Sequence, residues 1–82
     1  MTDSMELIIN SFIGAGYYDD AKSRFEEIKT LLFQKGVSNL DTDKLYEAIN
    51  YKLEELKKEK EFRAINTEIK TLYYELCTKY SL

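Results

Sequence analysis

The segment from Asp41 to Tyr80 contains neither Gly nor Pro and makes up nearly half of the 82-residue chain. Its apolar residues recur every three or four positions, which is the spacing of one face of an α-helix. They form two series, the first being Leu45, Ile49, Leu53 and Leu56, and the second Phe62, Ile65, Ile69, Leu72, Leu76 and Tyr80. We therefore predict that this segment is helical throughout.

A charged run from Lys57 to Glu61 separates the two series, and Leu56 lies six rather than seven residues before Phe62. Either one helix continues and its apolar face rotates, or the chain turns between residues 58 and 66. Lys and Glu favour helices, and the run offers no Gly or Asn to end one. These features favour one long helix over residues 41–80, with a break at 58–66 as the alternative.

The length of such a helix bears on assembly. At ~1.5 Å per residue it would be roughly 55–60 Å long, whereas a globule of this size is about 25–30 Å across. The residues before it cannot cover its whole apolar face, so we predict that a second copy does so in a homodimer. The alternative turn would give a compact four-helix monomer.

Two shorter helices are predicted before this segment, at about residues 4–14 and 17–35. Gly14 and Gly16 end the first, which is apolar on almost every side, and Gly36 ends the second. No alternating run of β-branched residues predicts a strand. The predicted fold is a single all-α domain over residues 1–82, with two short antiparallel helices packed on a long, kinked or broken amphipathic helix. Homodimerisation completes this helical bundle.

The junction between the first two helices resembles that of known helical-hairpin families. The pattern Gly16-x-Tyr18-x-x-Ala21-x-x-x-Phe25 is similar to the junction of tetratricopeptide and pentatricopeptide repeats, and its Gly-x-Tyr to that of ribbon-helix-helix repressors. Solenoid repeats need about three copies, and a ribbon-helix-helix protein needs a strand before its first helix. The chain has neither feature, so we assign it to none of these families.

Several chemistries lack their usual residues. The chain has no His and a single cysteine, Cys77, and it contains no Gly-rich phosphate loop and no metal-ligand spacing. We predict that it is not an enzyme and that it binds no cofactor or metal. One cysteine cannot form an internal disulfide, Asp3 and Glu6 stand where a signal peptide is basic, and no apolar run could span a membrane. These features predict a cytoplasmic protein without a transmembrane segment.

The aromatic content points to protein binding. Seven Tyr and four Phe exceed what so small a core needs, and Tyr is enriched at protein interfaces. The predicted function is a non-enzymatic interaction module, acting as a homo-oligomer that binds another protein as adaptor, inhibitor or regulator. The candidate interface residues are Tyr17, Phe33, Tyr51, Phe62, Ile65, Ile69, Leu72, Tyr74 and Leu76.

Two alternatives remain at this point. A small dimeric DNA-binding regulator would use the densest basic cluster, namely Lys52, Lys57, Lys58, Lys60 and Arg63. Glutamates interleave with these residues and the net charge is −3, so nucleic acid is not expected as a partner. The other alternative is a bundle of the immunity type, since small four-helix bacteriocin immunity proteins are similar in size and helix count.

Overall fold

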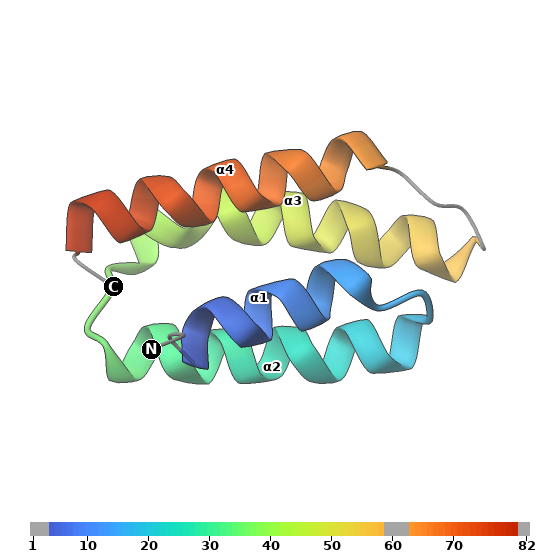
Figure 1. The fold of residues 1–82 in the computed structure, drawn as a ribbon, viewed down its shortest axis with the longest axis horizontal. Helices are drawn as coiled ribbons and strands as arrows, with labels where there is room; N and C mark the ends of the chain where they lie inside the picture. The colour runs from blue at the N-terminus through green and yellow to red at the C-terminus, as the bar shows by residue number, and fades with distance from the viewer. Residues whose placement is uncertain (1–3, 59–62, 81–82) are drawn as a thin grey trace.

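The computed structural model describes residues 4–58 and 63–80. These residues form four helices and no strand (Figure 1). The helices are α1 (Ser4–Gly14), α2 (Tyr18–Gln34), α3 (Asn39–Lys57) and α4 (Arg63–Tyr80). The prediction of an all-α chain is confirmed, and the first two helices begin and end within one residue of their predicted bounds.

Of the two predictions for residues 41–80, the favoured one of a single long helix is wrong, and the alternative of a break within residues 58–66 agrees with the structure. Helix α3 ends at Lys57, α4 begins at Arg63, and the two lie antiparallel against each other (Figure 1). The break falls between the two apolar series, where their phase changes. A continuous helix would carry the second series away from α1 and α2, whereas the antiparallel packing of α4 on α3 buries most of the described residues of both series in one core. Tertiary packing has therefore outweighed the local preference for one continuous helix.

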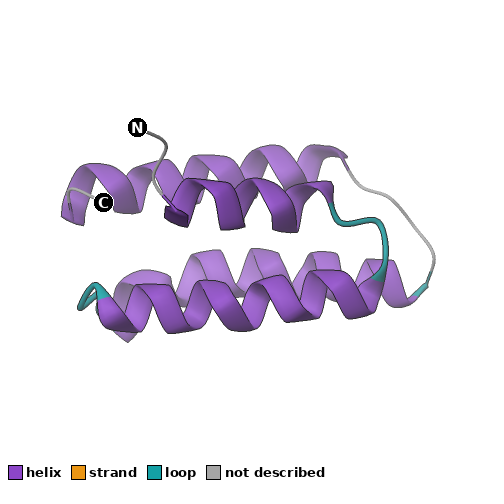
Figure 2. Cartoon of the chain, turned by 60° about the horizontal axis from the view of Figure 1, so that its bottom comes forward, coloured by secondary structure: helices purple, strands orange, loops and turns teal. Residues whose placement is uncertain are grey.

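The four helices form a bundle in which each packs against two others. Helix α1 lies against α2 and α4, and α3 lies against α2 and α4, while across one diagonal the Lys52 side chain of α3 reaches the end of α1. Figure 2 shows the resulting layers, with α1 and α4 in one and α2 and α3 in the other. Consecutive helices run in opposite directions, and the bundle measures 34 × 24 × 18 Å.

The core lies along the axis of the bundle and receives side chains from all four helices. From α2 it includes Ala21, Phe25, Ile28 and Leu32. From the C-terminal half it includes the first apolar series together with Ile65, Ile69 and Leu76 of the second. The apolar residues most completely removed from solvent are Met5, Ile9, Phe12, Ala21, Ile28, Leu32, Leu45, Ile49 and Ile69. Among the described members of the second series, Ile65, Ile69 and Leu76 are buried against the chain's own helices, and Leu72 and Tyr80 are partly buried.

The connection between α2 and α3 is fixed by hydrogen bonds at both helix ends. Gly36 adopts a φ of +74°, and its N–H donates to Phe33 O at 3.1 Å while that of Val37 donates to Leu32 O at 3.1 Å. This pair of bonds is a Schellman motif, and its left-handed residue is one for which Gly has no steric penalty. Ser38 then caps α3, because its Oγ accepts a hydrogen bond of 3.2 Å from the Leu40 N–H.

Candidate functional site

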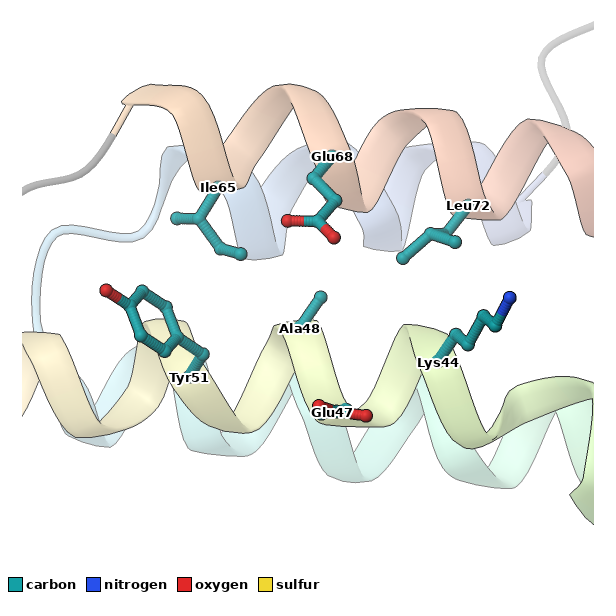
Figure 3. Close-up of a pocket in the computed structure, with 7 residues that line it drawn as sticks. All are labelled: Lys44, Glu47, Ala48, Tyr51, Ile65, Glu68 and Leu72. Carbon is teal, nitrogen blue, oxygen red and sulfur yellow. The ribbon is translucent and has the colours of Figure 1, made fainter.

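A groove runs between α3 and α4 on the outside of the bundle. Its apolar surface comes from Ala48 of α3 and from Ile65 and Leu72 of α4 (Figure 3). Ala48 is small and its side chain ends well short of the opposite helix, which leaves a hollow of about 300 Å³. The ring of Tyr51, 48% exposed, borders this hollow. The groove therefore combines an apolar floor with an exposed aromatic side chain.

A second hollow of about 220 Å³ adjoins the first along the same two helices. Lys44 and Leu72 line both, so the two hollows form one groove, which we call the α3–α4 groove. Its described lining residues are Asp41, Lys44, Leu45, Glu47, Ala48 and Tyr51 from α3, and Ile65, Glu68, Leu72, Glu75, Leu76 and Lys79 from α4.

Asp41 and Lys79 close one end of the groove as an ion pair. Lys79 Nζ donates to Asp41 Oδ1 at 2.8 Å, and the Tyr80 hydroxyl donates to Asp41 Oδ2. The same hydroxyl accepts a 3.2 Å hydrogen bond from the Ser38 N–H. The hydrogen bonds from Lys79 and Tyr80 lower the pKa of the Asp41 carboxyl below 3.8, and the bond to Asp41 raises the pKa of Lys79 above 10.5. This cluster ties the start of α3 to the end of α4.

The other charged groups of the groove are not engaged in this way. Within the described part of the chain, no ion pair or side-chain hydrogen bond is formed by Lys44, Glu47, Glu68 or Glu75. Three carboxylates therefore face one ammonium group. The groove has an acidic rim around its apolar floor.

The structure separates the predicted interface residues into several sites. Tyr51, Ile65, Leu72 and Leu76 line the α3–α4 groove, although Ile65 and Leu76 are largely buried. Ile69 is wholly inside the core. The remaining described candidates lie elsewhere on the surface, with Tyr17 78%, Phe33 84% and Tyr74 50% exposed. Phe62 lies outside the described residues.

The predicted basic cluster does not form one surface, because Lys52 is buried. Its ammonium group donates to Phe12 O at 3.2 Å, to Ile13 O at 2.7 Å and to Asn66 Oδ1 at 2.7 Å. It also lies 5.1 Å from the centre of the Phe12 ring. A phosphate could reach Lys52 only by displacing these contacts, so this residue is a structural group of the bundle interior.

Of the other basic candidates, the structure describes the side chains of Lys57 and Lys58. Lys57 Nζ lies 3.4 Å from Glu54 Oε1 and 4.8 Å from the centre of the Tyr18 ring. The charge of Glu54, followed by that of Tyr18, raises the pKa of Lys57 above 10.5. Lys58 follows the last residue of α3 and is exposed. Lys60 and the side chain of Arg63 lie outside what the structure describes.

Sequence reasoning missed Ala48 and the acidic rim. Ala48 lies three residues after Leu45, at the edge of the apolar face, and a small residue at such a position is the signal for a gap between helices. The rim residues Glu47, Glu68 and Glu75 carried no signal, because a solvent-facing Glu is ordinary on any helix. Only the antiparallel packing of α3 on α4 brings them together.

A third hollow, of about 480 Å³, lies beside α2, where Ile8 and Leu31 contribute apolar surface. Its rim also contains Glu26 and Glu27, but Glu26 pairs with Lys29 at 3.1 Å and Glu27 with Arg24 at 3.2 Å. These carboxylates are neutralised within the chain. This hollow lacks the unpaired charge that distinguishes the α3–α4 groove.

No group of three or more Cys, Asp and Glu residues in the described ranges is placed to hold a metal ion. None of the four helices, as described, combines the length and apolar character needed to cross a membrane. In comparisons with protein-family models, curated proteins and solved structures, no match to this chain was found. The geometry of the surface is therefore the basis for proposing a function.

Proposed function

We propose that this chain is a non-enzymatic protein-binding module and that the α3–α4 groove is its binding surface. The observation on which the proposal depends is the hollow of about 300 Å³ between α3 and α4, whose apolar floor is formed by the buried Ala48 and Ile65 and the partly buried Leu72. An apolar groove between two helices is a common site for a partner's side chains. Tyr51 at its edge supplies the kind of half-exposed aromatic group that is enriched at binding surfaces.

The proposal places binding on a single folded chain, not on a homodimer. The homodimer was predicted to cover the second apolar series, and support for a single chain comes from the packing of that series' described members against α1 and α3. A monomer with an open groove is the simplest protein-binding form of this fold. In this proposal a segment of the partner binds in the groove. A module that binds in this way can regulate or inhibit its partner, or link it to another protein.

The two alternative functions have less support. A DNA-binding regulator loses Lys52 from its basic surface, and Lys57 is already paired with Glu54. A four-helix count agrees with the immunity-type reading, but helix count alone does not specify a function.

Affinity capture tests the proposal, using lysate of the organism that encodes the chain and comparing three forms of the protein. Ala48→Leu fills the hollow with an apolar side chain whose helix preference is only slightly below that of Ala, so it should block the groove while leaving stability within about 1 kcal/mol of that of the unmodified chain. Phe33→Ala removes an exposed aromatic group far from the groove and serves as the matched control.

We expect the unmodified chain and Phe33→Ala to retain the same proteins, and Ala48→Leu to lose them while its urea unfolding shows that it is still folded. If Ala48→Leu retains the same proteins as the unmodified chain, the groove is not the binding surface. If Phe33→Ala alone loses them, binding lies at the α2 end of the molecule.

A further inference from the structure

The geometry points to a basic amphipathic helix of another protein as the occupant of the α3–α4 groove. This inference rests on the proposed function, because it identifies the chemical class of the partner at the same surface. It draws on three features of the groove: the backbone on both sides, the length of its lining, and the charges of its rim.

The backbone on both sides of the groove is helical, so its N–H and C=O groups are bonded within α3 and α4 and cannot pair with an added strand. A third helix can instead set its side-chain ridge into the furrow between two helices. The lining extends from Asp41 to Tyr51 on α3 and from Ile65 to Lys79 on α4. At ~1.5 Å per residue this is about 15–21 Å, the length of three to four helical turns.

The floor of the groove requires that the face of the partner helix that packs against it be apolar. Ala48 leaves a hollow between Ile65 and Leu72 that one large side chain of the partner would fill. A helix that enters it must present apolar residues on one face, spaced by three or four positions. Its flanks then come close to the charged rim.

The rim sets the charge of those flanks. Asp41 and Lys79 neutralise each other, and the remaining described lining residues are Lys44 (+1) against Glu47, Glu68 and Glu75 (−3), which leaves −2. Lys or Arg on the partner's flanks would complement these carboxylates. A second copy of this groove would bring −2 against −2, so pairing of two copies face to face is disfavoured.

A display library of helical peptides about 14 residues long tests the inference with defined probes. The apolar face varies among Leu, Ile, Phe and Met, and each flanking position varies among Lys, Gln and Glu. Binding of the best selected peptide and its all-Lys, all-Gln and all-Glu flank versions is then measured by fluorescence anisotropy at low and at physiological ionic strength.

We expect selection to enrich Lys at the flanks. The all-Lys version should bind roughly tenfold more tightly than the all-Gln version at low salt, with the difference shrinking as salt is added. The triple variant Glu47→Gln, Glu68→Gln and Glu75→Gln should abolish this difference while still binding the all-Gln version. Asp20→Asn, Glu26→Gln and Glu27→Gln on α2 change the net charge equally and should leave the difference in place.

Two results would overturn the inference alone. Peptides with Gln or Glu flanks that bind as well as those with Lys flanks, all of them weakened by Ala48→Leu, would leave the groove as a binding surface for a partner of different charge. A dimer in sedimentation that dissociates in Ala48→Leu would make a second copy the occupant. If no selected peptide is sensitive to Ala48→Leu, the proposed function fails as well.

Discussion

The Lys52 ammonium group donates a 2.7 Å hydrogen bond to the carbonyl oxygen of Ile13, in the last turn of α1. A helix leaves its last four carbonyl groups without partners inside the helix, and its C-terminal end carries partial negative charge. A buried ammonium group meets both needs, and Asn66 of α4 accepts a further bond of 2.7 Å from it. One side chain of α3 thus joins the end of α1 to α4.

Replacing Lys52 with Met should destabilise the fold by about 2–3 kcal/mol, because the apolar stem is kept while buried carbonyl groups lose a charged donor. Lys44→Met, at an exposed position of the same helix, should change stability by less than about 0.5 kcal/mol. Urea unfolding followed by circular dichroism measures both. Equal stabilities for the two variants would contradict the capping role of Lys52.

Asp41 should make the stability of the protein depend on acid. Its folded pKa lies below the ordinary 3.8, because Lys79 and Tyr80 bond the ionised carboxylate. The stabilisation from this carboxylate is therefore present above pH 3.8 and disappears as the pH falls through the folded pKa. Asp41→Asn should be less stable than the unmodified protein near neutral pH, and the difference should vanish in acid.

Thermal unfolding of the two proteins across this pH range provides the measurement. Asp43→Asn is the matched control, since Asp43 is an exposed carboxylate on the same helix. A stability difference for Asp41→Asn that stays constant down to the most acidic pH would show that the carboxylate charge contributes nothing to the cluster.

Ile69 and Tyr74, both candidate interface residues, should respond differently to truncation. Ile69 is fully buried, so Ile69→Ala should cost about 2–5 kcal/mol through lost burial and the cavity left behind. Tyr74 is 50% exposed, so Tyr74→Ala should cost less than about 1 kcal/mol. Chemical denaturation of both variants tests the assignment; similar losses would mean that Ile69 is not a core residue of the single chain.

The isolated protein should be a monomer. Most described residues of the two apolar series are buried within the chain, and the α3–α4 groove has the same charge sign on every copy. Sedimentation equilibrium should give the chain mass of 9.7 kDa at every concentration, and helicity should not fall on dilution. An apparent mass that rises to twice this value as the protein concentration increases would instead support the homodimer predicted from the sequence.

The helices were predictable because their local signals agree. Gly14, Gly16 and Gly36 mark the ends of the first two helices, and Ala21 to Leu32 show a clear stripe that the structure buries. The candidate groove was predictable only in part. Tyr51, Ile65 and Leu72 were recognised as interface candidates, but nothing in the sequence indicated that they face one another.

The end of α3 at Lys57 was hard to predict because the local sequence favours a continuous helix there, whereas tertiary packing favours two helices. Every residue of the charged run favours a helix, and the six-residue spacing from Leu56 to Phe62 was the one sign that the apolar face could not continue. This spacing decides between one helix and two only when the apolar surface that can be buried against α1 and α2 is known. That surface depends on the tertiary structure, so a local sequence pattern does not contain it.

Lys52 shows the same limit. It lies three residues after Ile49 and four before Leu56, on the buried face of α3, so its burial had a sequence signal. Its partners Phe12 and Ile13 are 40 and 39 residues away. The ion pair of Asp41 with Lys79 likewise follows only from the antiparallel arrangement of α3 and α4.

The order of the helices has a consequence for how the chain reaches this structure. Each helix packs against its neighbour in sequence, so the hairpins α1–α2 and α3–α4 both close over short distances along the chain. Such local closure costs little entropy and is typical of rapid folding. Helix α2 packs against α3, and Lys52 of the α3–α4 hairpin bonds the end of α1 in the α1–α2 hairpin. Each hairpin is therefore stabilised by contacts with the other, and the two are expected to melt in a single cooperative step.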